Sequence, residues 1–310
     1  MESPPTNLVA HLLKEGHELL LSPKQLEAYL AQNGRSAEGL LAAYRITGEA
    51  AFLREAEEKS PKDPCVAYAA LFTSESPEAR RQWLDTFKQS APDNALANYL
   101  SALEHFKAGQ TDEAVQDLMD AAGKAKFQEY GSDYVQNAEE AYLSAGYSAA
   151  EAKAAAAYWL PLPDLAALKD LARRTSELAS LYRQGGDGES AQAALQIALG
   201  MGQRLSEPGG EKCLMHEVVG LNIQRQILEG MDPAGAYDDS HTVRERLDRI
   251  AQQQEELKRL HDPALGMTGG LRQEVLQSLS EQDLIAYFDR MKVFGEREAL
   301  QWAMARQGRR

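Results

Sequence analysis

Apolar residues recur at three- and four-residue intervals along most of the chain, the spacing that places them on one face of an α-helix. The segment 94–108 shows this clearly, with Leu96, Tyr99, Leu103 and Phe106 at that spacing. Ala, Leu, Glu and Gln dominate, and no segment alternates apolar and polar residues for long enough to indicate a strand. The pattern therefore predicts an all-α fold.

Gly, Pro, Asn and Ser interrupt the pattern about every ten to twenty residues, which favours short antiparallel helices over a few long ones. Side-chain oxygens that can accept the free N–H groups of a helix start are offered by Ser22, Ser36, Ser76, Thr111 and Ser148. Helix ends are predicted at Gly109, Gly146, Gly185 and Gly295. The predicted helices span 6–21, 23–32, 36–46, 49–59, 64–73, 77–89, 94–108, 111–123, 131–145, 148–160, 164–184, 188–205, 211–229, 241–260, 270–279, 281–292 and 296–306.

One set of spacings occurs twice. A glycine ends a helix, and a small residue, a leucine and a second small residue follow at the same offsets, as Gly186, Ala191, Leu195, Ala198 and as Gly109, Ala114, Leu118, Ala121. A small residue at the first position lets the second helix of a pair approach the first closely, and the next two share its inward face. These residues resemble the tetratricopeptide repeat, a helix-turn-helix unit of about 34 residues.

The resemblance covers roughly 36–205 and implies a right-handed superhelix of antiparallel helix pairs, a TPR-like α-solenoid. We expect N-terminal helices over 1–35, the repeat array over 36–205, and a non-repeat helical C-terminal region over 206–310 that packs on the array. The segment 242–260 carries a narrow apolar stripe, which we expect to pack against the helix near 218–228. A coiled-coil partner is the alternative for this stripe.

The charge balance argues against nucleic-acid binding. The chain has 33 Lys and Arg residues but 47 Asp and Glu residues, and the resulting net charge of −14 repels a polyphosphate backbone. Cys65 and Cys213 lack the C-x-x-C spacing of a thiol zinc site, so we expect two free buried thiols. No run is long and apolar enough to span a bilayer. The start lacks a signal peptide, which predicts a cytoplasmic protein, with export or membrane tethering after leader removal as the alternative.

No catalytic, cofactor-binding or metal-binding residue is predicted. His216-Glu-Val-Val-Gly220 has a glycine where the zinc metalloprotease motif needs its second histidine, so we interpret His216 as a partly exposed helix residue. Gly146-Tyr-Ser-Ala-Ala150 lacks the strand and the final glycine of a nucleophile elbow, and Gly266-Met-Thr-Gly-Gly270 lacks the lysine of a phosphate loop.

The resemblance implies that a partner binds in a concave groove lined by the first helix of each pair. On one such helix a polar face is formed by Arg173, Ser176, Ser180 and Arg183. On an earlier one the corresponding face is apolar and contains Tyr99, Leu103 and Phe106, which are interpreted either as core or as groove residues. Together the two faces would accept an extended or helical segment that carries an acidic group.

The predicted function is therefore a non-enzymatic protein-protein interaction scaffold that binds a protein or peptide. In this respect the chain resembles bacterial repeat proteins more than any repeat enzyme. The alternative is a helical-repeat hydrolase, or an accessory subunit of an enzyme complex. An open acidic cavity with convergent His and carboxylate groups would favour the alternative. The sequence makes no prediction about the oligomeric state.

Overall fold

The computed structural model describes residues 21–158, 162–207, 212–260 and 271–307. These ranges contain sixteen helices and no strand, which confirms the all-α prediction for the described part of the chain. The helix predicted over 6–21 and the glycine-rich segment 266–270 lie outside the described residues. None of the helices described is both long and apolar enough to cross a membrane.

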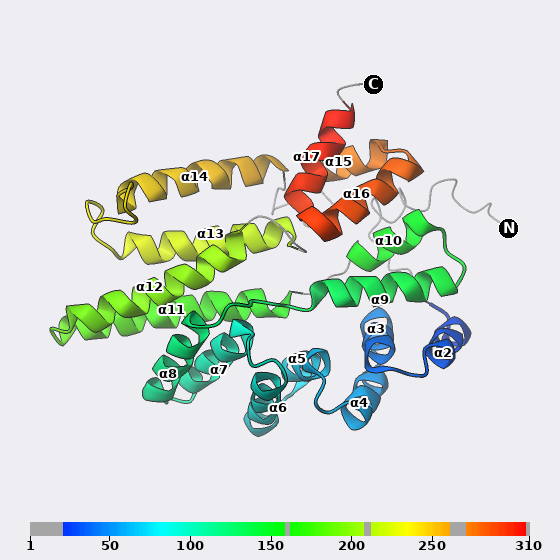
Figure 1. Cartoon of the computed structure of the whole chain (residues 1–310), viewed down its shortest axis with the longest axis horizontal. Coiled ribbons are helices and arrows are strands. Elements are labelled where there is room, and N and C mark those ends of the chain that lie inside the picture. The colour runs from blue at the N-terminus through cyan, green and yellow to red at the C-terminus, as the bar shows by residue number, and fades with distance from the viewer. Residues whose placement is uncertain (1–20, 159–161, 208–211, 261–270, 308–310) are drawn as a thin grey trace.

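The first part of the fold is a row of short helices (Figure 1). It contains α2 (Pro23–Gln32) followed by the pairs α3 (Ala37–Thr47) and α4 (Ala50–Lys59), α5 (Pro64–Thr73) and α6 (Pro77–Ser90), and α7 (Ala95–Lys107) and α8 (Thr111–Ala122). Within each pair the two helices pack together, and α4 and α6 each pack on the first helix of the next pair. The pairs therefore stack in chain order along this row.

Two further pairs pack on the row. They are α9 (Gly131–Ser144) with α10 (Ala149–Tyr158), and α11 (Pro163–Gln184) with α12 (Gly188–Ser206). Helix α9 packs on α2 and α3, α11 packs on α7, and α12 packs on α8. After α8 the chain therefore returns to the beginning of the row, and Figure 1 shows α9, α11 and α12 lying along it.

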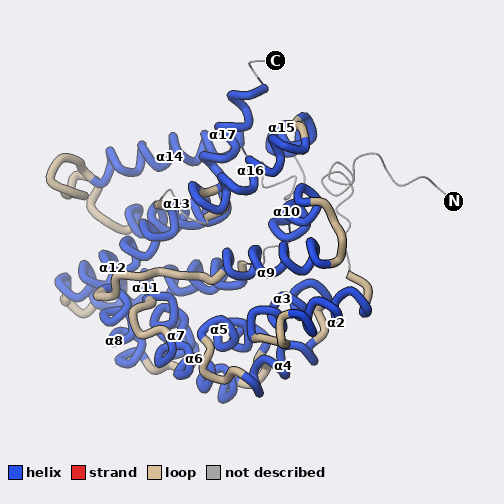
Figure 2. Tube along the Cα trace, turned by 45° about the vertical axis from the view of Figure 1, so that its right-hand side comes forward, coloured by secondary structure: helices blue, strands red, loops and turns tan. Residues whose placement is uncertain are grey.

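The C-terminal helices cover the other side of these pairs (Figure 2). Helix α13 (Leu214–Glu229) packs on α12, and α14 (Val243–Leu260) packs on α13, which confirms the intramolecular packing expected for 242–260. Helices α15 (Leu271–Ser278), α16 (Glu281–Phe294) and α17 (Glu296–Gln307) form a small group, in which α16 contacts α10.

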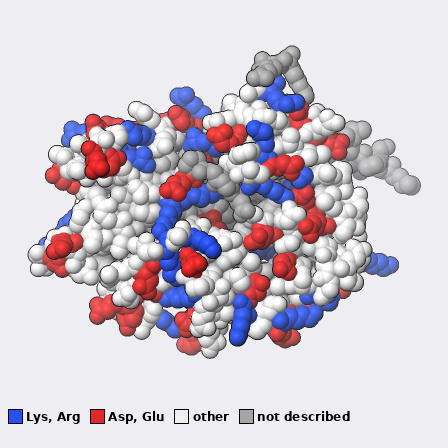
Figure 3. All heavy atoms as spheres, in the orientation of Figure 1, with Lys and Arg blue, Asp and Glu red and all other residues white. Residues whose placement is uncertain are grey.

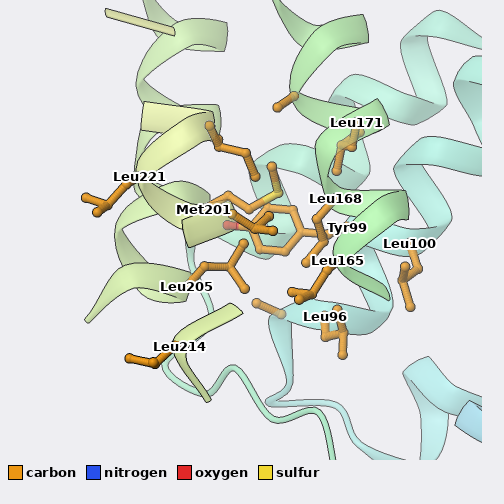
Figure 4. Packing of buried hydrophobic residues seen from close by; sticks show 14 of the residues in the cluster. Leu96, Tyr99, Leu100, Leu165, Leu168, Leu171, Met201, Leu205, Leu214 and Leu221 are labelled. Atoms are coloured by element: carbon orange, nitrogen blue, oxygen red, sulfur yellow. The ribbon is translucent and has the colours of Figure 1, made fainter. Parts of the chain in front are cut away.

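The main core lies where α7, α11, α12 and α13 meet (Figure 4). Tyr99 is 1% exposed and its ring lies among leucines of α11 and the side chains of Met201 and Leu205 from α12. Ala114 and Ala191 are both fully buried, as the inward small-residue positions predict. A second core cluster joins α2–α5 to α9 and α10.

Most predicted helix boundaries are confirmed, with two corrections. Ser22, Ser36 and Ser76 accept backbone N–H groups as N-caps. Thr111 instead is the first residue of α8, and Gln110 precedes the helix without a side-chain cap bond. Of the two adjacent glycines after α11, it is Gly186 and not Gly185 that takes the left-handed conformation, with φ of 82°.

Candidate functional site: a channel along α3, α5 and α7 and a buried polar cluster

Two adjacent hollows open between the C-terminal ends of α3, α5 and α7 and the first turns of α11. The larger one, of about 290 Å³, is lined by Tyr44, Arg45, Gly48, Ala69, Phe72, Thr73 and Pro163. The smaller one, of about 210 Å³, is lined by Leu71, Phe72, Arg80, Leu100, Leu103, Glu104, Lys107 and Ala167. Phe72 lines both, so the two hollows are neighbours, and together we call them the α3–α7 channel.

Phe72 is held in place by the way α5 is built. Pro64 occupies the first turn, and Asp63 caps the helix by accepting the N–H groups of Cys65 and Val66 at 2.8 and 3.1 Å. The middle of α5 is buried on all sides, so the helix cannot rotate without loss of packing. Near its end the half-buried ring of Phe72 packs edge-on against Tyr68, with centroids 5.1 Å apart. The channel therefore has a fixed aromatic wall.

Cations outnumber carboxylates in the channel. Glu104 contacts both Arg80, at 3.4 Å, and Lys107, at 2.7 Å, so one carboxylate serves two cations. The guanidinium of Arg45 lies over the ring of Tyr134, 5.0 Å from its centroid, and no carboxylate of the described residues forms a salt bridge with it. Although the chain as a whole is acidic, the channel combines an apolar lining with a local excess of positive charge.

The polar face predicted from the sequence lies elsewhere on α11. Arg173 and Arg183 are exposed, and Arg173 forms ion pairs with Asp170 and Glu177, both at 2.5 Å. The hydroxyls of Ser176 and Ser180 donate to carbonyl oxygens one turn earlier in the same helix. The channel instead uses Pro163 and Ala167, at least six residues earlier, or roughly 9 Å along the helix. The structure does not bring the polar face to the channel, and its role in binding stays a prediction.

The apolar face predicted on α7 lies largely in the core. Tyr99 is enclosed by α11 and α12, and Leu103 is 3% exposed. Phe106 is half-buried and packs against the main core cluster. Leu103 contributes to the wall of the smaller hollow, and Tyr99 and Phe106 do not line either one. Phe72, Arg45 and Arg80 were not identified from the sequence, because no local pattern marks them.

A cluster of buried polar groups joins four segments of the chain behind the channel. The hydroxyl of Tyr68 on α5 donates to Asp164 Oδ1 on α11 at 2.8 Å. The carboxyl group of Asp164 interacts with that of Glu129, which precedes α9, and Glu129 Oε2 lies 2.5 Å from His216 Nε2 on α13. His216 is 2% exposed, so the interpretation of this residue as partly exposed is wrong. The reason is that α13 buries it against the segment containing Glu129.

The segment containing Glu129 is fixed by Asn94, the N-cap of α7. The side chain of Asn94 donates to the Gln128 carbonyl at 2.8 Å and accepts the Gln128 N–H at 3.0 Å. Two residues after Gln128, Tyr130 has φ of 55°. This is the left-handed region, which a bulky residue adopts only when its surroundings hold it there. Glu129 is therefore presented to α11 and α13 by a rigid backbone.

The cluster shifts the pKa values of its members. Burial and the charge of Glu129 raise the pKa of Asp164 from 3.8 to about 7. For His216 burial opposes the charged form, but the hydrogen bonds to Cys213 and Glu129 outweigh it and raise the pKa to about 11. At neutral pH the cluster thus holds a protonated imidazole beside two interacting carboxyl groups. Perturbed groups of this kind occur both in functional sites and in structural ion-pair networks.

Charge on the molecular surface is mixed. On the face seen in Figure 3, Asp and Glu side chains are spread widely, and Lys and Arg side chains gather near the centre. Arg204 on α12 has a structural role. Its guanidinium donates to the Lys124 carbonyl at 2.7 Å and to the Ala122 carbonyl at 3.3 Å. These bonds tie α12 to the segment that follows α8.

Comparison of the chain with protein-family models, with curated proteins and with solved structures finds no match. The α3–α7 channel and the buried cluster are therefore the features on which a function can be argued.

Proposed function

We propose that the chain is a non-enzymatic interaction scaffold, and that its α3–α7 channel binds an extended or helical segment of a partner protein. Apolar side chains of the partner enter the two hollows beside Phe72, and its carboxylates lie near Arg45, Arg80 and Lys107. The observation that carries this proposal is the pair of hollows that meet at Phe72, with an apolar lining and an excess of cations. Apolar pockets with a few placed charges are the usual form of a peptide site.

The resemblance to tetratricopeptide repeats supports the same location. In such arrays the first helix of each pair lines the concave groove, and here α3, α5 and α7 are the first helices of three consecutive pairs. We infer that these pairs form a short right-handed TPR-like superhelix. Its groove is narrowed by the first turns of α11, which supply Pro163 and Ala167 to the channel.

The hydrolase alternative has support from one observation, the convergence of His216, Glu129 and Asp164. A hydrolase needs such groups beside a space that admits substrate. Asp164 is fully buried, His216 is nearly so, and neither hollow of the channel is lined by any of the three. The geometry therefore favours the scaffold.

A display library of random peptides selected on the immobilised chain tests the proposal. We expect selected peptides to combine apolar residues, spaced to fill both hollows, with Asp or Glu. Binding should fall at least tenfold when Phe72→Ala removes the shared wall. The double variant Arg45→Glu and Lys107→Glu should prefer peptides with Lys or Arg, because the sign of the channel charge is reversed.

The matched control is the double variant Arg173→Glu and Arg183→Glu, which changes charge on α11 outside the channel. It should retain the affinity of the selected peptides, and circular dichroism should show each variant folded. Peptides that bind the Phe72→Ala variant as tightly as the native chain would place the binding surface elsewhere.

A further inference from the structure

The chain has a second chemical feature that the scaffold does not use, a cysteine next to the buried cluster. Cys213 is the N-cap residue of α13 and is half-buried. Its Sγ lies 3.1 Å from Nδ1 of His216, and the other nitrogen of the same ring lies 2.5 Å from Glu129 Oε2. The three-residue separation at a helix start brings the thiol and the imidazole together. The imidazole thus contacts the thiol with one nitrogen and the carboxylate with the other.

This order of groups is the one that activates a nucleophile. A cationic imidazole within hydrogen-bond distance favours the thiolate form of a cysteine, and a third group orients the ring. Here Nδ1 of His216 faces both the backbone N–H and the Sγ of Cys213, while Glu129 holds the other side of the ring. Since Asn94 and the strained Tyr130 fix the backbone around Glu129, the ring has little freedom to turn away.

The surroundings of Cys213 select the kind of electrophile. The backbone N–H of Leu214 begins α13, and it donates to Glu296 Oε2 at 2.8 Å. This donor is therefore not free for the oxyanion that acyl transfer generates, and the carboxylate disfavours an anionic reagent. Neither hollow of the channel reaches Cys213. A small, neutral electrophile fits these conditions, and hydroperoxides are of this class.

We propose that Cys213 is a hydroperoxide-reactive thiol, with His216 as the imidazolium that stabilises the sulfur as a thiolate and Glu129 as the residue that positions the ring. The sulfur attacks one peroxide oxygen, so that an S–O bond forms as the O–O bond breaks. The sulfur is oxidised to sulfenic acid and the peroxide is reduced. The leaving oxygen takes a proton from the imidazolium and departs as water or an alcohol, and the ring is then protonated again from the solvent.

Cys65 provides an internal reference. It is also free and half-buried, but it lies near the start of α5 with the carboxylates of Asp63 and Asp133 close by. Burial and these negative charges raise the pKa of the Cys65 thiol well above its ordinary value. Thiols in such surroundings are poor nucleophiles. The two cysteines can therefore be compared within one molecule.

The test exposes the full native chain to hydrogen peroxide at neutral pH, traps sulfenic acid with dimedone, and measures each labelled cysteine by peptide mass spectrometry. We expect Cys213 to be labelled at least ten times faster than Cys65. In urea, where the cluster is dispersed, the two rates should become equal. A native ratio below ten would overturn the proposal.

The variant His216→Asn separates the chemical role of the imidazole from a structural one. Loss of the imidazolium should slow labelling of Cys213 at least tenfold and leave Cys65 unchanged. If His216 only packed the start of α13, its replacement would loosen the site and make Cys213 react faster, which would contradict the proposal. Should this variant fail to fold, Glu129→Gln replaces it, with a smaller slowing expected and unchanged or faster labelling counting against the proposal.

Discussion

Gly202 on α12 and Gly220 on α13 face each other where the two helices cross. A Cβ atom at Gly220 would lie 2.6 Å from the carbonyl oxygen of Gly202 and 2.6 Å from the backbone nitrogen of Ser206. The two backbones are therefore in direct contact, and neither position has room for a side chain. This contact joins α12 to the C-terminal region of the chain. It also gives a physical reason for a glycine at the position where a metalloprotease motif would need histidine.

Replacement of Gly220 by Ala should destabilise the fold. The added methyl group meets backbone atoms, which cannot move aside as a flexible side chain can, so we expect a loss of about 1–3 kcal/mol in the free energy of unfolding. Gly200 is the matched control on α12, because a Cβ there would meet nothing within 4 Å. Gly200→Ala should leave stability unchanged or raise it by about 0.5–1 kcal/mol, since alanine favours the helix. Urea denaturation measures both, and equal effects would contradict the close crossing.

The contact between α9, α10 and α16 depends on Glu139. Its carboxylate pairs with Lys153 on α10, at 2.8 Å, and with Lys292 on α16. All three side chains are largely buried, with exposures of 9%, 12% and 23%. Glu139→Gln leaves Lys292 without its carboxylate and Lys153 with only the exposed Asp289, 2.6 Å away, and we expect a loss of about 1–3 kcal/mol in the free energy of unfolding.

The control for Glu139 is Glu255→Gln on α14, which removes an ion pair whose two side chains are both 63% exposed. Because water screens such a pair, its loss should change stability by less than about 0.5 kcal/mol. Thermal or urea denaturation compares the two variants. Similar losses in both would show that Glu139 does not hold the C-terminal helices on α9 and α10.

Asp164 should make stability depend on pH. Its pKa is about 7 in the folded chain and 3.8 ordinarily, so between these values the folded form keeps a proton that the unfolded form releases. The contribution of this group therefore falls as pH rises from about 4 to 7, by up to about 1.4 kcal/mol per pH unit. Asp164→Asn cannot titrate, and its stability relative to the native chain should rise through this window.

Urea denaturation at several pH values between about 4 and 8 measures this difference. The reference variant is Asp170→Asn on α11, because Arg173 and Arg174 outweigh partial burial and hold the pKa of Asp170 below its ordinary value, outside the window. Its difference from the native chain should stay level over the same range. If the difference in stability between Asp164→Asn and the native chain also stayed constant with pH, the Asp164 carboxyl would not be protonated in the folded chain.

The local features of the fold could be predicted from the sequence. Apolar spacing and cap residues set most helix boundaries, because both act within one or two turns. Ser148 and Glu151, for example, form the reciprocal capping bonds that their spacing predicts. Thr111 was misassigned because a threonine can begin a helix as well as cap it. At Gly185 and Gly186 either glycine can take the left-handed conformation, and the sequence alone does not distinguish them.

The sites could be predicted only in part, because they depend on contacts between distant segments. The apolar face of α7 was recognised, but whether Tyr99 is core or groove depends on α11 and α12 crossing over it. The buried cluster draws Tyr68, Glu129, Asp164 and His216 from four separate segments. No spacing in the sequence links them, whereas Cys213 and His216 are close enough in the chain for their pairing to be suspected.

The most direct test of the scaffold account is to locate a bound peptide by photo-crosslinking. A photoreactive phenylalanine analogue replaces Phe72 in the channel or, in a second variant, Leu181 on α11, which is 63% exposed and lines neither hollow of the channel. Each variant is irradiated with a peptide selected on the native chain. The account predicts crosslinks from position 72 and not from position 181. Crosslinks from position 181 alone would contradict it and place the partner on the outer face of α11.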